Sequence, residues 1–257
     1  MDKDKLKEMN IKEERNNLVV QSNSLIRNIK SIKQDLSVTE QKLIIFLISK
    51  ICADDKDFKK VSVNLSQFVN ICGIKKSGRE FEQIKSSIKI LSDKSWWIDD
   101  ENGSQLFRWI DTSNISKYKT IELIFSESLK PYLLELNKNF TKYELINVLC
   151  LRSKYSIRLY EIFKSYLWLG KWEITLDEFK ELLNIKDKYT NYKELKRRII
   201  NQSLKEINKF TDLNITVDEE KYGNKVYKLI FKITEKQGYQ MVLDLIHTQD
   251  ERLKIED

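Results

Sequence analysis

Hydrophobic positions recur along the chain in short blocks, spaced alternately like the buried face of a helix and like that of a strand. In the first half this pattern predicts a strand at 17–22 and a helix from Val38 with Ser37 as its N-cap. A strand and a short helix capped at Asn64 or Ser66 follow within 61–74, and then a helix over 75–94. The last predicted elements are a hairpin of strands at 95–100 and 105–112, a strand at 118–126, and a helix near 128–136. Three helices followed by a hairpin and a strand are the order of a winged helix, a helix-turn-helix with a β wing.

The second half repeats this order. It predicts long helices over 141–170, a strand and a capped helix over 173–185, a helix over 191–210, and a hairpin over 213–234 that turns at Tyr222-Gly223-Asn224. At a constant offset of 111 residues, Val63, Leu65, Phe68, Ile71 and Ile74 correspond to Ile174, Leu176, Phe179, Leu182 and Ile185, and Phe81, Ile84 and Ile88 correspond to Tyr192, Leu195 and Ile199. Chance agreement of apolar spacing is the alternative, but the shared order of elements favours a repeat.

The patterns therefore predict an α+β fold of two tandem winged-helix domains. We place a flexible N-terminal arm at 1–16, the first domain at 17–136, the second at 140–234, and a C-terminal tail without assigned function at 235–257. Two groups of side chains are expected in the core, the tryptophans Trp96, Trp97, Trp109, Trp168 and Trp172 and the cysteines Cys52, Cys72 and Cys150.

Composition argues against several classes of function. The 257 residues contain one histidine, His247, so a catalytic triad, a His-based zinc site or a His-dependent nuclease would rest on that single residue. None of the six glycines lies in a P-loop pattern. The N-terminal segment is charged throughout, and no apolar run approaches the roughly 20 residues of a membrane span. We expect a cytoplasmic protein with no membrane association, catalytic residue, metal or cofactor.

Positive charge is concentrated in one predicted helix. The net charge is +7, and residues 186–209 alone hold eight basic and three acidic side chains. Arg can donate two hydrogen bonds to guanine and Asn can pair with adenine, while Lys can neutralise phosphates. A solvated amphipathic helix is the alternative, but the position between a short capped helix and a hairpin is that of a recognition helix. The DNA-contacting side chains predicted here are Lys193, Lys196, Arg197, Arg198, Asn201 and Lys205.

Other basic residues give weaker signals. In the equivalent helix of the first domain, Arg79, Gln83 and Lys89 face outward, with Lys75 and Lys76 just before them; this helix is predicted either to read DNA or to contact another protomer. Arg152, Lys154 and Arg158 open the long helix of the second domain, where they bind phosphates or pair with carboxylates such as Glu161. Lys221 and Lys225 flank the second hairpin turn, as in a wing that touches the DNA backbone.

Three segments carry a family resemblance. The most specific is SKYSIRLYEIFKSY at 153–166, which is close to S-x-Y-[SA]-x-R-L-Y-E-L-L; the others are ITLDEFKELLNI with the following YKELKRRII, and NLVVQSNSLI near the N-terminus. Over about residues 16–234 the chain resembles the iteron-binding plasmid replication initiators, the Rep proteins built from two winged-helix domains.

The resemblance implies a function that the residues alone do not show. Such initiators bind directly repeated sites at a plasmid origin as monomers, help to melt an adjacent AT-rich region, recruit host initiator and helicase proteins, and often repress their own gene as dimers. The resemblance implies a monomer–homodimer equilibrium and a principal reading helix in the second domain. The alternatives are a winged-helix transcriptional regulator without a replication role, a protein-interaction module, and a nuclease with an unrecognised acidic site.

Overall fold

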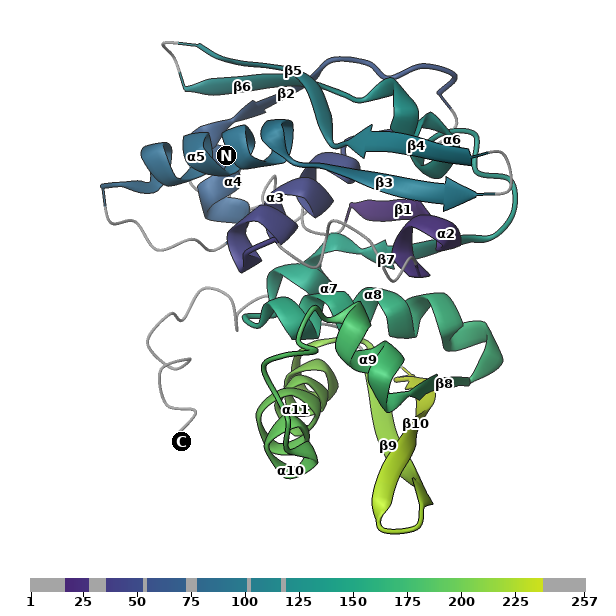
Figure 1. The fold of residues 1–257 in the computed structure, drawn as a ribbon. Coiled ribbons are helices and arrows are strands. Elements are labelled where there is room, and N and C mark those ends of the chain that lie inside the picture. The colour runs from purple at the N-terminus through teal and green to yellow at the C-terminus, as the bar shows by residue number, and fades with distance from the viewer. Residues whose placement is uncertain are drawn as a thin grey trace.

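The computed structural model describes residues 17–27, 36–52, 55–72, 78–100, 103–116 and 119–237. Figure 1 shows one winged helix above and a second below, with α7 and α8 between them. The arm at 1–16, most of the tail, His247, Lys75 and Lys76 lie outside the described residues.

The first winged helix is assembled around capped helices. Its elements are α3 (Val38–Ile48), β2 (Val61–Asn64), α4 (Leu65–Ile71), α5 (Glu80–Asp93), β5 (Ile110–Ile115) and β6 (Thr120–Phe125). Ser37 and Glu40 form a capping box, in which the Ser37 hydroxyl accepts from the Glu40 backbone N–H and the Glu40 carboxylate accepts from the Ser37 backbone N–H. Asn64 caps α4. Both predicted caps are confirmed.

The sheet of this domain differs from the prediction. The run 105–112 is not one strand, because the chain bends at Trp109 and separates β4 (Gly103–Arg108) from β5. β4 pairs with β3 (Ser95–Asp100) as a two-stranded hairpin, whereas β5 and β6 pair with β2 in the order β2-β6-β5. The β5–β6 pair is therefore the wing of this sheet. Trp109 is fully buried, so packing of its ring favours the bend over a continuous strand.

The second winged helix has the predicted order of elements. They are α8 (Lys154–Tyr166), β8 (Lys171–Thr175), α9 (Leu176–Leu182), the helical run of α10 (Tyr192–Leu195), a π-helical segment (Lys196–Ile200) and α11 (Asn201–Phe210), and the strands β9 (Leu213–Tyr222) and β10 (Lys225–Glu235). The sheet order β8-β10-β9 matches that of the first domain. Helix α9 begins and ends 111 residues after α4, so the structure supports the repeat.

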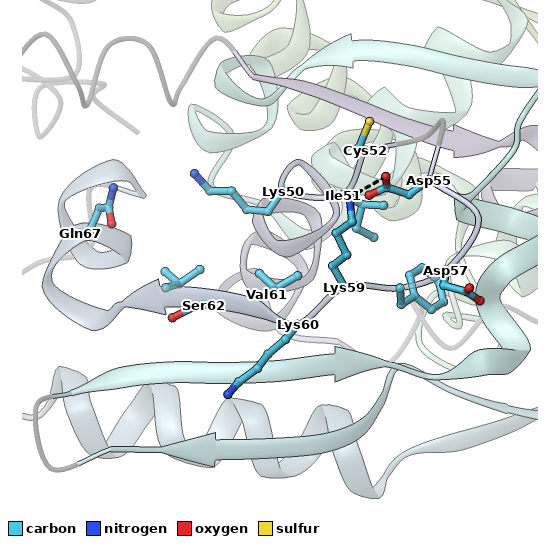
Figure 2. Close-up of a pocket in the computed structure, with 12 residues that line it drawn as sticks. Lys50, Ile51, Cys52, Asp55, Asp57, Lys59, Lys60, Val61, Ser62 and Gln67 are labelled. Carbon is cyan, nitrogen blue, oxygen red and sulfur yellow. Dashed lines mark hydrogen bonds and ion pairs between the residues drawn. The ribbon is translucent and has the colours of Figure 1, made fainter.

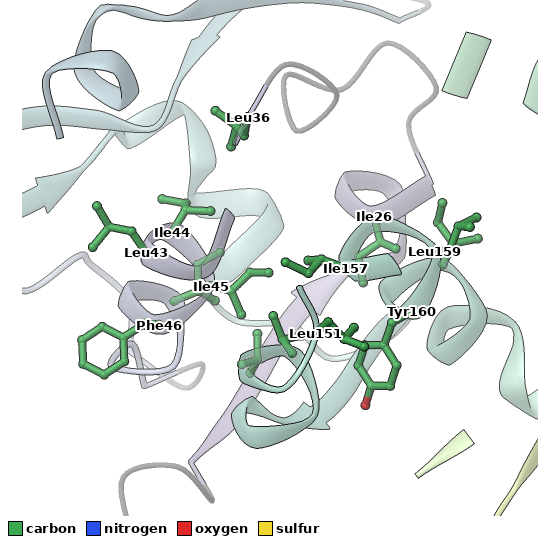
Figure 3. Close-up of a cluster of buried hydrophobic side chains, with 14 of the residues drawn as sticks. Ile26, Leu36, Leu43, Ile44, Ile45, Phe46, Leu151, Ile157, Leu159 and Tyr160 are labelled. Carbon is green, nitrogen blue, oxygen red and sulfur yellow. The ribbon is translucent and has the colours of Figure 1, made fainter. Parts of the chain in front are cut away.

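A short sheet and an apolar layer join the two predicted domains. Strand β1 (Leu18–Ser22) pairs antiparallel with β7 (Phe140–Glu144), and β7 leads into α7 (Leu145–Leu149). Helix α2 (Asn23–Arg27) packs against α8, and α3 packs against both α7 and α8. Figure 3 shows Ile45, Leu151 and Ile157 meeting in this layer, and buried residues of both halves form one continuous cluster. The boundary at 136–140 stays a prediction.

Buried polar side chains cross the same junction. The Tyr143 hydroxyl donates to the Glu161 carboxylate at 2.8 Å, and the Gln21 amide donates to both groups at 2.8 and 3.0 Å. Arg158 is 2% exposed and its charge is favoured electrostatically by Glu161. Burial lowers the pKa of Arg158 to about 10, so the guanidinium stays positive at neutral pH. Of the two interpretations of Arg158, its burial argues against phosphate binding and its electrostatic attraction to Glu161 favours a role beside that carboxylate.

Several expectations about secondary structure and burial differ from the structure. The segment 140–144 is a strand rather than part of a helix, because Thr141 and Tyr143 alternate inward against β1. The helix predicted near 128–136 is present but shorter, because a 3-10 turn (Glu127–Leu129) leads into α6 (Lys130–Leu133), which ends at Leu133. Three side chains expected in the core are instead exposed on the surface: Cys52, Trp97 and Trp168.

Within the described residues, no helix is both long and apolar enough to cross a bilayer. The same part of the chain holds no group of three or more His, Cys, Asp or Glu side chains arranged for a metal ion.

Candidate nucleic-acid interface

The helical run 192–210 presents one face to the core and one to solvent. Asn191 caps it by accepting from the Lys193 backbone N–H at 2.9 Å. Leu195, Ile199, Ser203 and Ile207 are buried, as the helical spacing predicts. This apolar face anchors the helix against α8 and β9 and leaves the other face for a ligand.

A π-helical segment, which the sequence did not indicate, interrupts this run at Lys196–Ile200. A π turn holds more residues than an α turn, so it rotates the following side chains relative to an ideal α-helix. Accordingly Ile199 and Ile200 are both buried, as are Ser203 and Leu204. The segment contains Arg197 and Arg198, whose side chains remain exposed. Such segments occur frequently at functional sites.

The solvent face carries most of the side chains predicted to read DNA. Those exposed are Lys193, Arg197, Arg198, Asn201 and Lys205. Among the described residues, no ion pair involves Lys193 or Lys205. The structure thus brings cations and an amide together on one helix face, the combination that the major groove accepts.

One carboxylate on this face holds both arginines. The Glu194 oxygens accept from an Arg197 terminal nitrogen at 3.1 Å each, and one of them accepts from Arg198 Nε at 2.6 Å. These bonds, from Arg198 first and then Arg197, lower the pKa of Glu194. Glu194 is therefore ionised at neutral pH and offsets part of the positive charge beside it.

A second carboxylate ties the helix to the wing. Glu219 of β9 accepts from the Tyr192 hydroxyl at 2.5 Å and from the Lys196 ammonium at 2.6 Å. Burial opposes ionisation of Glu219, but the hydrogen bonds from Lys196 and Tyr192 outweigh it and lower its pKa. Lys196 was predicted to contact DNA; the structure directs its ammonium toward the wing.

The hairpin of β9 and β10 projects from the second winged helix as its wing (Figure 1). Tyr222 is 85% exposed and precedes Gly223, whose φ of +59° suits the left-handed turn. Lys221 and Lys225 are exposed on either side, as predicted, and Tyr227 is half exposed on β10. Tyr222 is an exposed residue of the wing that the sequence did not single out. The available signal was its place in a Lys-Tyr-Gly-Asn-Lys turn, where an aromatic side chain has no core to enter.

Arg152 and Lys154 lie at the start of α8, which packs beside α11. Arg152 is exposed, and its backbone N–H donates to Glu206 of α11 at 2.5 Å, which brings the start of α8 next to α11. The Lys154 ammonium lies over the Tyr155 ring, 5.2 Å from its centroid. Both positions adjoin the basic face, whereas Arg158 points away from it into the core.

The first domain shows a weaker version of this face. Arg79 and Gln83 are exposed and line an open groove between α5 and the start of α3. Lys89 forms an ion pair with Asp93 on the same helix. The structure thus provides less uncompensated positive charge on α5 than on the helix at 192–210.

A hollow of about 430 Å³ beside β2 gathers further lysines (Figure 2). Lys59 pairs with Asp55 at 2.8 Å, and Lys60 pairs with Glu122 at 2.7 Å. Because acidic partners balance these lysines, we assign the hollow no part in the interface.

Comparisons with known proteins agree with the fold. A family model described as "Initiator Replication protein, WH1" matches residues 18–164, and one described as "Initiator Rep protein, WH2" matches residues 175–233. Two curated Escherichia coli proteins are similar, "Replication initiation protein" (34% identical over 152 residues) and "PI protein" (32% over 145). They match 57% and 49% of this chain, and the match covers 47% of each relative. The aligned region thus spans about half the length of these relatives.

A solved structure extends the comparison over most of the chain. The "Pi initiator protein in complex with iteron DNA" superposes with a TM-score of 0.73 and covers 87% of this chain and 99% of its own, at 20% identity. At that identity the likeness concerns the fold. It confirms the prediction of two tandem winged helices.

Proposed function

The chain belongs to the initiator Rep protein family, and we propose that it binds directly repeated sites, or iterons, in double-stranded DNA at a plasmid origin. One observation carries this proposal: the exposed basic and amide-bearing face of the helix at 192–210, placed next to a wing with an exposed basic tip. A winged helix uses these two elements to contact a groove and the adjacent backbone.

Each group of side chains then has a different task. Arg197, Arg198 and Asn201 are proposed to read base edges in the major groove. The remaining predicted contacts are proposed either to neutralise phosphates or to support the side chains that do so. They are Lys193, Lys196, Lys205, Arg152, Lys154, Lys221 and Lys225 in the second domain, and Lys75, Lys76, Arg79, Gln83 and Lys89 in the first. Tyr222 joins this group at the wing tip, where an aromatic ring can enter the minor groove.

The larger role follows from the family. We propose that binding to several adjacent repeats opens the neighbouring AT-rich DNA and recruits host initiator and helicase proteins in the bacterial cytoplasm. A homodimer of the chain would repress its own gene. In this mechanism the protein makes and breaks no covalent bond; bending and multivalent loading supply the free energy for opening.

A binding titration tests the core of the proposal. The wild-type protein is titrated into labelled duplexes that carry the direct repeats next to its gene, and into shuffled duplexes of equal composition. We expect tighter binding to the repeats and a steep loss of affinity as salt rises, because phosphate contacts release counterions. Equal affinity for both duplexes, or affinity independent of salt, would contradict the proposal. Repeat binding without support of plasmid replication would instead favour a transcriptional regulator.

A further inference from the structure

Glu194 occupies an unusual position for a surface that binds DNA. It is an acidic side chain on the basic face, 43% exposed, and it accepts hydrogen bonds from both arginines assigned to base reading. A carboxylate so placed repels phosphates and competes with them for Arg197 and Arg198. The sequence suggested only that Glu194 projects from the outer face.

The carboxylate holds groups that a base contact needs. One terminal nitrogen of Arg197 donates to both oxygens of Glu194, whereas an arginine released from a carboxylate can donate to the two acceptors of guanine, O6 and N7. A guanine that faces the helix in the groove can therefore accept two hydrogen bonds from an arginine that leaves Glu194. An unrelated sequence lacks this pair of acceptors at the groove edge, and there the arginines reach phosphates only by giving up the carboxylate.

We infer that Glu194 is a specificity-determining residue that withholds Arg197 and Arg198 from non-cognate DNA and releases them only where base acceptors replace it. It is a positioning residue, because it acts through the two arginines. Specificity here depends on a repulsive element as well as on attractive contacts. This inference rests on the proposed DNA binding.

The fold does not depend on these ion pairs. The side chains of Arg197 and Arg198 are 64% and 59% exposed, and exposed ion pairs contribute little to stability. The helix is anchored instead by its buried face and by the Asn191 cap. Glu194 can therefore be changed without unfolding the domain, which makes the inference testable by substitution.

The test compares Glu194→Gln with Glu235→Gln. The control makes the same change in net charge and also removes an ion pair, the one between the exposed Glu235 and the largely buried Lys164. Lys164 keeps its bond to Asp212 at 2.8 Å, and Glu235 lies at the end of the hairpin opposite the wing tip. Both variants and the parent are titrated against two duplexes of about 20 base pairs, roughly two helical turns. One carries the sequence that the parent selects from a randomised library, and the other is a shuffled sequence of the same composition.

The parent must first bind the selected duplex more tightly than the shuffled one, and failure there refutes the proposed function itself. For E194Q we expect affinity for the shuffled duplex to rise about fivefold, affinity for the selected duplex to stay within about twofold, and the slope of log affinity against log salt on the shuffled duplex to steepen by about one to two, since two more arginines reach phosphates. E235Q should behave like the parent. If the parent discriminates and E194Q matches E235Q on both duplexes, the role of Glu194 is refuted while the proposed function stands.

Discussion

Replacing Tyr143 with Phe removes one hydroxyl from the buried polar cluster at the junction of the two winged helices. That hydroxyl donates to the buried Glu161 carboxylate at 2.8 Å and accepts from the Gln21 amide at 2.8 Å. A hydrogen bond to a charged group contributes about 1.5–3 kcal/mol, and the Gln21 amide keeps its other bond to Glu161 at 3.0 Å. We therefore expect Tyr143→Phe to lower the free energy of unfolding by about 2–3 kcal/mol. Arg158→Met leaves Glu161 without its buried cation and should cost more, about 3–5 kcal/mol.

The pH dependence of stability adds an independent readout. Burial first, and then the charge of Glu161, raises the pKa of Tyr143 well above its ordinary value. Up to about pH 10 the folded and unfolded states both keep this proton. Above that, the unfolded tyrosine ionises while the folded one does not, so stability falls as pH rises, by at most about 1.4 kcal/mol per pH unit for this group. The Tyr143→Phe variant should therefore lack this contribution to the loss of folding stability at alkaline pH.

Urea unfolding followed by circular dichroism measures both effects. Tyr155→Phe is the control for loss of a hydroxyl, because the described residues show no hydrogen bond of the Tyr155 hydroxyl and its ring is only partly buried against the core. Burial also raises the pKa of Tyr155, so this control applies to the comparison at neutral pH. The expected order of stability is parent and Tyr155→Phe together, then Tyr143→Phe, then Arg158→Met. A Tyr143→Phe variant with the parent's midpoint and the parent's m-value would refute the idea that this cluster holds the junction together.

Three further outcomes follow from the interface and the caps. Arg197→Ala and Asn201→Ala should each weaken binding to the repeat by about 1–3 kcal/mol and relax base preference at one position, as measured by fluorescence anisotropy on single-base variants. Lys221→Ala or Lys225→Ala should weaken binding to all duplexes alike and reduce the salt slope by about one, without changing base preference. Ser37→Ala removes the side-chain acceptor of a capping box and should lower stability by about 1 kcal/mol in thermal unfolding, with DNA affinity unchanged when measured at a temperature where the variant is folded.

Local patterns sufficed where a structural feature depends on neighbours in the chain. The cap at Ser37 needs only Glu40 three residues later, and the helix α4 needs Asn64 before an apolar run. The face of the helix at 192–210 follows from the spacing of Leu195, Ile199 and Ile207, all of which are buried. Because α4 and α9 obey the same local rules, their bounds repeat at one constant offset.

Long-range contacts account for the expectations that were wrong. The segment at 140–144 becomes a strand because β1, about 120 residues earlier in the chain, offers it a free edge, and no local signal shows that partner. The hairpin after α5 divides at Trp109 because the ring enters the core. Trp97 lies opposite Leu106 on the outer face of the β3–β4 pair, although both are apolar. Composition cannot distinguish the two faces of such a hairpin.

The shared core gives the proposed interface a constraint that neither domain has alone. Domains joined by small polar contacts move relative to one another by default, but here the junction is apolar and is crossed by the β1–β7 pairing and the Glu161 cluster. Under the proposed function, α5 and the helix at 192–210 then meet DNA as one rigid unit. Because folding already fixes the two helices relative to one another, binding of the second helix costs little additional conformational entropy. A second contact therefore adds affinity even when its charge is weak. Under the proposed function, the less basic α5 can then contribute to binding. The more basic helix at 192–210 brings α5 to the duplex, and the rigid junction holds α5 in position.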